Sequence, residues 1–216
     1  MSVIEGIISL FVVLFAITVH EASHGWAALK MGDPTAYQMG RITLNPIRHI
    51  DPVGTILLPL ILIIMGAPPF GWAKPVPVNP LNLKDPRKDN LIISFAGPAS
   101  NISVAVIAFI ILKILMNLNP SMFYASGGGL TNVISPLITI VYYTIVINVI
   151  LAFFNLIPIP PLDGSGIIMG LMSEEAAQKY EQIRPYGFFI LILLIMTGFI
   201  GRILGFVIQI VNSLIY

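Results

Sequence analysis

The sequence predicts a membrane all-α bundle of about four to six transmembrane helices, with a short membrane-associated β hairpin or sheet and a re-entrant segment. Apolar residues make up 56% of the 216 residues and charged residues only 10%, whereas soluble chains are usually about a quarter charged. No charged residue occurs from Ile114 to Leu162, and the stretch from Tyr186 to Tyr216 contains only Arg202. Uncharged stretches of this length are typical of membrane spans.

The composition also excludes several classes of protein. The net charge of +1 is too small for a typical nucleic-acid-binding protein, so we expect no nucleic-acid partner. The apolar composition excludes an intrinsically disordered chain. The absence of cysteine excludes disulfides, thiolate metal sites and cysteine nucleophiles. We expect residues 1–216 to form a single integral-membrane domain that contacts the lipid bilayer.

The first predicted element is a helix from about Val3 to Lys30, which Gly32-Asp33-Pro34 ends because proline cannot continue a helix. It is interpreted as a retained helix, because no basic residue precedes its apolar part as in a signal peptide. Arg41–Asn45 then alternates polar and apolar residues, which predicts a strand. Val53–Met65 is too short to span a bilayer and contains a glycine and a proline, which favours a re-entrant hairpin.

The chain after Val53–Met65 is predicted to contain three longer apolar elements. Gly71–Pro80 is rich in proline and is expected to be extended. Leu91 to about Met116 and Asn132 to about Ile157 are expected to be spans joined by a glycine-rich loop. After a short amphipathic surface helix at Ser173–Arg184, Tyr186–Ser213 is expected to be a last span. Its glycines leave open whether this span is one helix or a kinked pair.

Basic residues predict the orientation, because cytoplasmic loops carry an excess of Lys and Arg. The segment 30–88 is rich in them, the segment 117–131 has none, and Lys179 and Arg184 follow the third span. We therefore expect a multi-pass protein of the cell membrane with segments 30–88 and 164–185 on the cytoplasmic side. This orientation requires that Val53–Met65 does not cross the membrane. It also places the candidate site, which is described next, towards the cytoplasm.

A chemical function is indicated by His20, Glu21 and His24, which form a His-Glu-x-x-His pattern on the first helix. Positions i and i+4 share one helix face, so both imidazoles can bind one metal ion and the glutamate can act as general base. His20 precedes Lys30 by about 15 Å of helix, which places ionisable groups in or near the hydrocarbon, where they are usually functional. The alternative is a pair of packing histidines, which leaves Glu21 unexplained.

The third metal ligand is predicted to be Asp163. A catalytic zinc ion takes three protein ligands and leaves a fourth position for water, and the only other histidine is His49. Asp163 is the first charged residue after the long uncharged stretch, where prolines break the span. The predicted topology places it on the same face as the histidines, so we expect one zinc ion per chain. An ordinary turn aspartate before glycine is the alternative.

Together these motifs carry a resemblance to a known family. They are His20-Glu21-x-x-His24 and Asn155-x-x-Pro158-x-Pro160-Pro161-x-Asp163-Gly164, and the chain resembles the site-2 protease family of intramembrane zinc metalloproteases. The segments Gly40–Pro46, Gly71–Pro80 and Ala96–Asn101 are similar to the compact bacterial and archaeal members. No PDZ or CBS-type accessory domain is visible in this sequence.

The resemblance implies cleavage of a peptide bond within or beside a transmembrane helix of a membrane-protein substrate. It implies that His20, His24 and Asp163 bind zinc and that Glu21 is the catalytic base. It also implies that Asn155 is a polar group near the metal. As a functional residue Asn155 would stabilise an oxyanion, and its alternative role is an interhelical hydrogen bond.

A substrate helix must unwind before it is cut, and its freed backbone groups then need new partners in the membrane. We therefore expect the substrate to add as a β-strand to one edge. The expected edge consists of Arg41, Ile42, Thr43, Leu44 and Asn45, and Pro75–Val78 is a second candidate. A plain structural hairpin is the alternative. Asn101 is a further expected substrate contact, with close helix packing as its alternative role.

Two other functions remain open at this level. A divalent-cation transporter would also place His and Asp in the membrane, but it has little need of Glu21 and favours acidic groups on several spans. A catalytically inactive, protease-like scaffold would not need to keep Glu21 intact. The sequence does not indicate the substrate, a regulatory partner or the oligomeric state.

Overall fold

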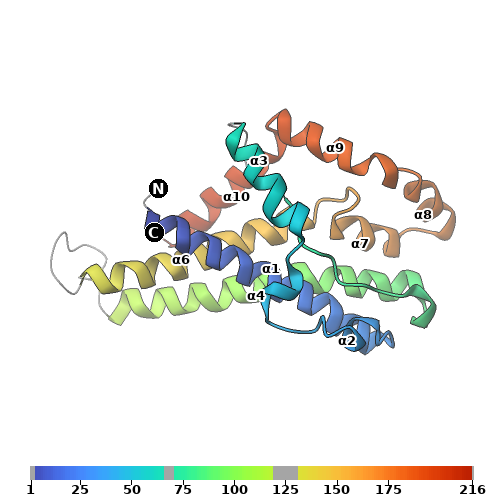
Figure 1. Cartoon of the computed structure of the whole chain (residues 1–216), viewed down its shortest axis with the longest axis horizontal. Helices are drawn as coiled ribbons and strands as arrows, with labels where there is room; N and C mark the ends of the chain where they lie inside the picture. The colour runs from blue at the N-terminus through green and yellow to red at the C-terminus, as the bar shows by residue number, and fades with distance from the viewer. Residues whose placement is uncertain (1–2, 66–70, 119–130, 216) are drawn as a thin grey trace.

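The computed structural model describes residues 3–65, 71–118 and 131–215, which form a bundle of helices elongated along one axis (Figure 1). Its helices are α1 (Val3–Met31), α2 (Thr35–Gln38), α3 (Leu58–Ile64), α4 (Pro86–Leu118), α6 (Thr131–Asn155), α7 (Asp163–Leu171), α8 (Glu174–Glu181), α9 (Arg184–Met196) and α10 (Phe199–Ile215). Short 3₁₀ turns at Pro46–His49 and Pro80–Asn82 and a π-helical turn at Pro52–Leu57 join some of them.

Three helices form the centre of the bundle and are long and apolar enough to cross a membrane. The candidate spans are Ile4–Met31 in α1, Pro86–Leu118 in α4 and Pro136–Asn155 in α6. Helix α4 packs against α1, α6 and α7. Many large apolar side chains on these helices are exposed, such as Phe11 and Ile107. Such a surface is unusual for a soluble monomer and is expected for one that faces lipid.

The last apolar region is a broken helix. Helices α9 and α10 are bent by 66° relative to each other, and Gly198 between them has a φ of 72°. This left-handed conformation is one that glycine adopts without a Cβ clash. The kinked-pair alternative is therefore confirmed. Counting the pair as one span gives up to four spans in the described part of the chain.

The predicted β hairpin or sheet is wrong, because the described residues contain no strand. The backbone around Arg41–Asn45 is used locally instead. Arg41 N donates to Ala36 O, and the ring of His49 hydrogen-bonds Thr43 O. The Asn45 side chain accepts from Ile47 N at the start of a 3₁₀ turn. Alternation over five residues was too weak a signal to outweigh these side-chain hydrogen bonds to the backbone.

The segment predicted to be a re-entrant hairpin is helical where the structure describes it. A π-helical turn at Pro52–Leu57 leads directly into α3. The apolar helix Pro52–Leu62 is shorter than the roughly 20 residues that cross a bilayer. Residues 66–70 lie outside the described part, and the re-entrant path remains a prediction.

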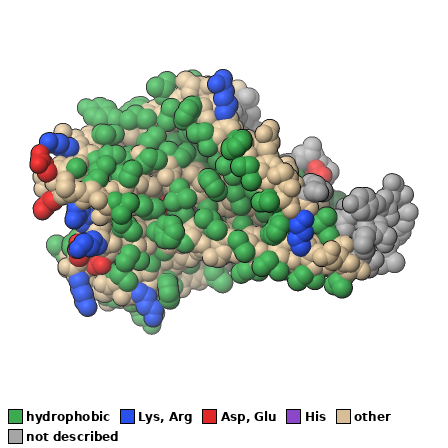
Figure 2. All heavy atoms as spheres, turned by 180° about the vertical axis from the view of Figure 1, so that it is seen from behind, with side chains coloured by type: hydrophobic (Ala, Val, Ile, Leu, Met, Phe, Trp, Pro, Cys, Tyr) green, Lys and Arg blue, Asp and Glu red, His purple; other side chains and the backbone are tan. Residues whose placement is uncertain are grey.

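On the face seen in Figure 2, most charged side chains gather at one end and apolar side chains cover the middle, with two basic patches elsewhere. This end contains α2, α8 and the beginning of α4, and both chain termini lie at the opposite end (Figure 1). Within the two segments that were predicted to share one side of the membrane, α2, the beginning of α4 and α8 therefore lie at the same end of the bundle, whereas α3 lies nearer its middle (Figure 1).

Candidate metal centre

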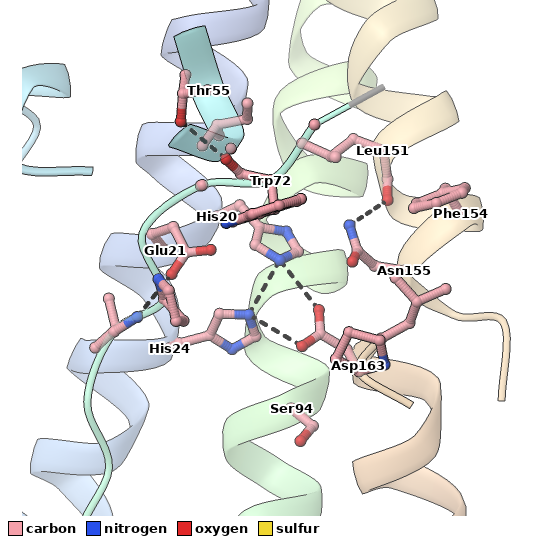
Figure 3. A pocket seen from close by; sticks show the side chains of 18 of the residues that line it. His20, Glu21, His24, Thr55, Trp72, Ser94, Leu151, Phe154, Asn155 and Asp163 are labelled. Carbon is pink, nitrogen blue, oxygen red and sulfur yellow. Dashed lines mark hydrogen bonds and ion pairs between the residues drawn. The ribbon is translucent and has the colours of Figure 1, made fainter. Parts of the chain in front are cut away.

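Two helices that are distant in sequence bring together the three predicted metal ligands (Figure 3). His20 and His24 come from α1, and Asp163 is the first residue of α7. The Nε2 atoms of the two histidines lie 3.0 Å apart. The Asp163 carboxylate lies 3.0 Å from Nε2 of His20 and 3.3 Å from Nε2 of His24. One ligand atom from each residue lies within 4.8 Å of the others.

The hydrogen bonds of the Nδ1 atoms, on the side of each ring away from the cluster, define which nitrogen of each imidazole carries the proton. Nδ1 of His24 lies 2.7 Å from the carbonyl oxygen of Ile93, which can only accept a hydrogen bond. Nδ1 of His20 lies 2.6 Å from Oδ1 of Asn101. Both Nδ1 atoms therefore carry the proton, which leaves a lone pair on each Nε2.

The donor set fits a divalent cation. Two Nε2 lone pairs converge on a carboxylate, so neither imidazole can donate a hydrogen bond to it. In agreement, Oδ2 of Asp163 is buried and has no hydrogen-bond partner among the residues that the structure describes. These three groups repel one another when no cation is present and would become ligands of a bound cation, and imidazole nitrogen and carboxylate oxygen are together a ligand set that zinc accepts. A backbone carbonyl or amide behind each histidine is also the usual outer shell of a zinc site.

The local sequence explains how the ligands come so close. The proline-rich segment after α6 ends that helix, and α7 begins at Asp163 after an extended Leu162. Gly97 of α4 faces both imidazoles: a Cβ at this position would lie 2.4 Å from Nε2 of His24 and 2.6 Å from Cε1 of His20. Only a residue without a side chain leaves room for the rings.

Glu21 is held by the extended segment 71–78, which runs beside α1. The backbone N–H of Val76 donates to Oε2 of Glu21 at 3.0 Å, and the Glu21 side chain points into the same region as the histidines (Figure 3). The segment is fixed on both sides of Val76. Arg41 donates to Lys74 O, and Asn79 N donates to Oδ2 of Asp33.

The three ligands and Glu21 line a cavity of about 960 Å³. Its walls also include Thr55, Trp72, Ser94 and Asn155, together with side chains of α9. The ring of Trp72 meets that of Phe188 at 6.1 Å between centroids. The cavity lining is mainly apolar with a few polar groups, as in most small-molecule and peptide sites.

Asn155 lies on the cavity wall at the end of α6. Its Nδ2 donates to Leu151 O one turn earlier, which leaves its second N–H and its oxygen for the cavity. The side chain faces the His20–Asp163 pair (Figure 3). The structure therefore places this predicted residue beside the metal centre.

The other residues predicted to contact substrate do not line the cavity. Arg41 is only 4% exposed and binds a backbone carbonyl of the extended segment. Ile42 packs towards Gly25, whereas Leu44 and Asn45 are exposed. The carbonyl oxygen of Thr43 accepts a hydrogen bond from His49, whose side chain is buried and only 2% exposed. Asn101 is fully buried behind His20.

Several contributors to the centre were missed at the sequence level. They are the bond from the Val76 amide to Glu21, the close approach of Gly97 to both imidazoles, and the hydrogen bonds from the histidines to Ile93 O and Asn101. Ile93, Gly97 and Asn101 follow one another at intervals of four in α4. This spacing places them on one helix face and was the available signal, but it does not by itself say which helix that face meets.

The comparison with known proteins agrees with this geometry. The profile of peptidase family M50 matches residues 8–198. A Bacillus subtilis protein named "Putative zinc metalloprotease YwhC" is 40% identical over 85% of this chain and 78% of that protein. Proteins named "Putative zinc metalloprotease Rip2" from Mycolicibacterium smegmatis and Mycobacterium tuberculosis are 25% and 23% identical, over 88% and 85% of this chain. The matches span 66% and 64% of those two proteins. No solved structure matches this chain significantly.

Proposed function

The chain belongs to peptidase family M50, the site-2 protease family, and from this premise we propose that it is an active intramembrane zinc endopeptidase. It hydrolyses peptide bonds within or next to transmembrane helices of membrane-protein substrates, as in regulated intramembrane proteolysis. One observation carries the proposal. The metal-ligating cluster and Glu21 line one large cavity, and three of these four residues lie in a helix long enough to span a membrane.

His20, His24 and Asp163 are the proposed zinc ligands. When bound, zinc supplies the Lewis acidity that polarises a peptide carbonyl and makes water a better nucleophile at neutral pH. The protein holds the two imidazoles in the tautomer that offers Nε2, and it keeps the site largely enclosed. His20 is 5% and His24 9% exposed, and such enclosure strengthens electrostatic interactions within the site.

Glu21 is the proposed general base. One carboxylate oxygen accepts the Val76 N–H, which fixes the side chain and leaves the other oxygen for the attacking water. Glu21 accepts the proton of that water and passes it to the amine that leaves. A positioned carboxylate in this role contributes about 10²–10⁴ to the rate.

Asn155 is the proposed second catalytic residue. Its remaining N–H is directed to stabilise negative charge on the carbonyl oxygen of the scissile bond, and loss of such a donor typically lowers turnover by about 10²–10³. The bond to Leu151 O limits the rotation of the amide. The side chain is therefore ready before substrate binds.

The substrate segment is proposed to bind in the cavity in an unwound form. The walls come from α1, α4, α6, α9 and the extended segment 71–78. A bound substrate segment would therefore be surrounded by protein and not by lipid. This shields its freed backbone groups, which would be costly in the hydrocarbon.

We also propose that residues 1–216 act as one domain and that the charged end of the bundle faces the cytoplasm.

A comparison of membrane proteomes tests the proposal. Cells that lack the endogenous protein would express wild-type chain, Glu21→Gln or, as a matched control, Glu175→Gln, which changes an exposed glutamate. We expect fragments that end inside transmembrane segments with wild type and Glu175→Gln, and accumulation of the intact precursors with Glu21→Gln. Identical fragments in all three would reject proteolysis by this site.

A further inference from the structure

A chain of buried amides lies directly behind His20. Asn101 of α4 and Asn148 of α6 are both 0% exposed. Oδ1 of Asn101 meets Nδ1 of His20 at 2.6 Å. Its Nδ2 donates to Ala16 O at 3.1 Å and to Oδ1 of Asn148 at 2.8 Å. Nδ2 of Asn148 donates to Thr144 O at 2.8 Å. The network joins the three central helices at the level of the metal centre.

The donor-to-acceptor direction of the network is determined by two backbone carbonyls, Ala16 O beside Asn101 and Thr144 O at the far end. Thr144 O is a backbone carbonyl and can only accept, so the amide nitrogen of Asn148 must face it. Oδ1 of Asn148 then faces Asn101, which must offer nitrogen to it and oxygen to His20. The only group left to donate in that last bond is Nδ1–H of His20. The lone pair of His20 is thereby placed on Nε2, the nitrogen that faces His24 and Asp163.

The second histidine is held differently. His24 donates to the backbone carbonyl of Ile93, an acceptor that no side-chain substitution removes. The orientation of His20 depends instead on a replaceable side chain. Asn101 also uses both its N–H groups and its oxygen, so the buried amide is well satisfied. Helix packing alone would require the bonds to Ala16 and Asn148 but not the bond to His20.

We infer that Asn101 is a positioning residue that holds His20 in the Nδ1-protonated tautomer and orients its Nε2 atom towards the metal. This inference rests on the proposed zinc-binding function for its consequence, but its structural content concerns His20 alone. Outer-shell partners of metal-ligating histidines typically contribute a factor of about 10–100 in metal affinity. Asn101 thus acts through His20 and does not contact substrate.

The test reads the tautomer and the zinc affinity separately. Because the chain has 3 histidines, ¹⁵N NMR of histidine-labelled, zinc-free protein in detergent resolves each ring. We expect Nδ1-protonated His20 in wild type and a loss of this preference in Asn101→Leu, with His24 unchanged. Zinc affinity, measured by competition with a chelator, is expected to fall about 10–100-fold. Asn101→Ala, a smaller change, is the second variant if Asn101→Leu does not fold.

Two further variants separate positioning from packing. Asn148→Leu removes an amide from the network but leaves the bond between Asn101 and His20. It also leaves the bond from Asn101 Nδ2 to Ala16 O, which still fixes the orientation of the Asn101 amide, so this variant should lower thermal stability and keep both the tautomer and the zinc affinity. Asn101→Asp keeps the acceptor for His20, so zinc affinity should stay well above that of Asn101→Leu.

The inference is overturned if zinc-free wild type carries the His20 proton on Nε2. It is also overturned if the Asn101 and Asn148 variants weaken zinc binding equally. The tautomer result stands whether or not the chain proves to be a protease.

Discussion

At the scale of single residues, the metal centre depends on the absence of a side chain as much as on its ligands. Alanine normally stabilises an exposed helix interior over glycine by up to about 1 kcal/mol. At Gly97 the sign should reverse, because the added Cβ would lie 2.4 Å from Nε2 of His24. We expect Gly97→Ala to lower zinc occupancy of the purified protein strongly, as measured by metal analysis.

Gly201 provides the matched control for this prediction. It also lies in an apolar helix, but a Cβ there would meet nothing within 4 Å. Gly201→Ala should therefore keep full zinc occupancy and equal or higher thermal stability. Full zinc occupancy in Gly97→Ala would show that the imidazoles are not constrained by α4 as described.

The carboxylate ligand gives a second prediction at this scale. Asp163→Asn keeps the shape of the side chain but removes the charge that balances the cation, and one of three ligands is weakened. We expect purified Asp163→Asn to lose most of its zinc while its helical content is unchanged. Metal analysis with circular dichroism checks this. Stoichiometric zinc in the folded variant would remove Asp163 from the ligand set.

At the scale of elements, the extended segment beside Glu21 is anchored by Asp33. The carboxylate accepts hydrogen bonds from Thr35, Asn79 and Asn82. Burial alone would raise the pKa of Asp33, but these hydrogen bonds outweigh it and lower the pKa below its usual value. A lowered folded-state pKa means that ionised Asp33 stabilises the fold above its unfolded pKa near 4. This stabilisation is lost as the pH falls through the folded-state value.

Asp33→Asn tests this anchor. Hydrogen bonds to charged groups contribute about 1.5–3 kcal/mol each, so the variant should unfold at a lower temperature than wild type at pH 7. The difference should shrink below about pH 4, because wild type then loses the same charge. Thermal unfolding of the two proteins across this pH range measures it. A difference that does not change with pH would mean that the charge of Asp33 is not what holds the segment.

The elements also show what sequence patterns can and cannot predict. The long spans α1, α4 and α6 were predictable because about 20 consecutive apolar residues have few alternative explanations. The kink before α10 was foreseen as an alternative from its glycines. The strand at Arg41–Asn45 was not a safe prediction, since a five-residue alternation cannot reveal whether a partner strand exists. Here side chains such as His49 and Asn45 satisfy that backbone locally.

At the scale of the whole molecule, the gathering of charges at one end predicts the result of a labelling experiment. The chain has no native cysteine, and Tyr37, Leu81 and Leu118 are 65%, 92% and 75% exposed. We expect cysteines at positions 37 and 81 to react from the cytoplasmic side in intact cells, and one at position 118 to react from outside. Labelling of positions 37 and 81 from opposite sides would contradict the arrangement.

The candidate site was predictable from sequence to the extent that its chemistry lies in rare side chains. His20, His24 and Asp163 stand out because ionisable groups are scarce in these spans, and the structure brings them together. The parts that support them are common residues, such as Gly97, Asn101 and the Val76 amide. Their roles depend on which helix faces meet, and that is a property of the packed bundle.

The central claim is that this site cleaves peptide bonds, and the most direct measurement is cleavage of a transmembrane peptide in proteoliposomes. The peptide would carry a helix-breaking Gly-Pro pair, which lowers the cost of unwinding. Wild type and Glu21→Gln would be compared at equal zinc content. We predict cleavage by wild type and a loss of at least about 10²-fold with Glu21→Gln. Equal rates of cleavage by the two proteins would contradict the account.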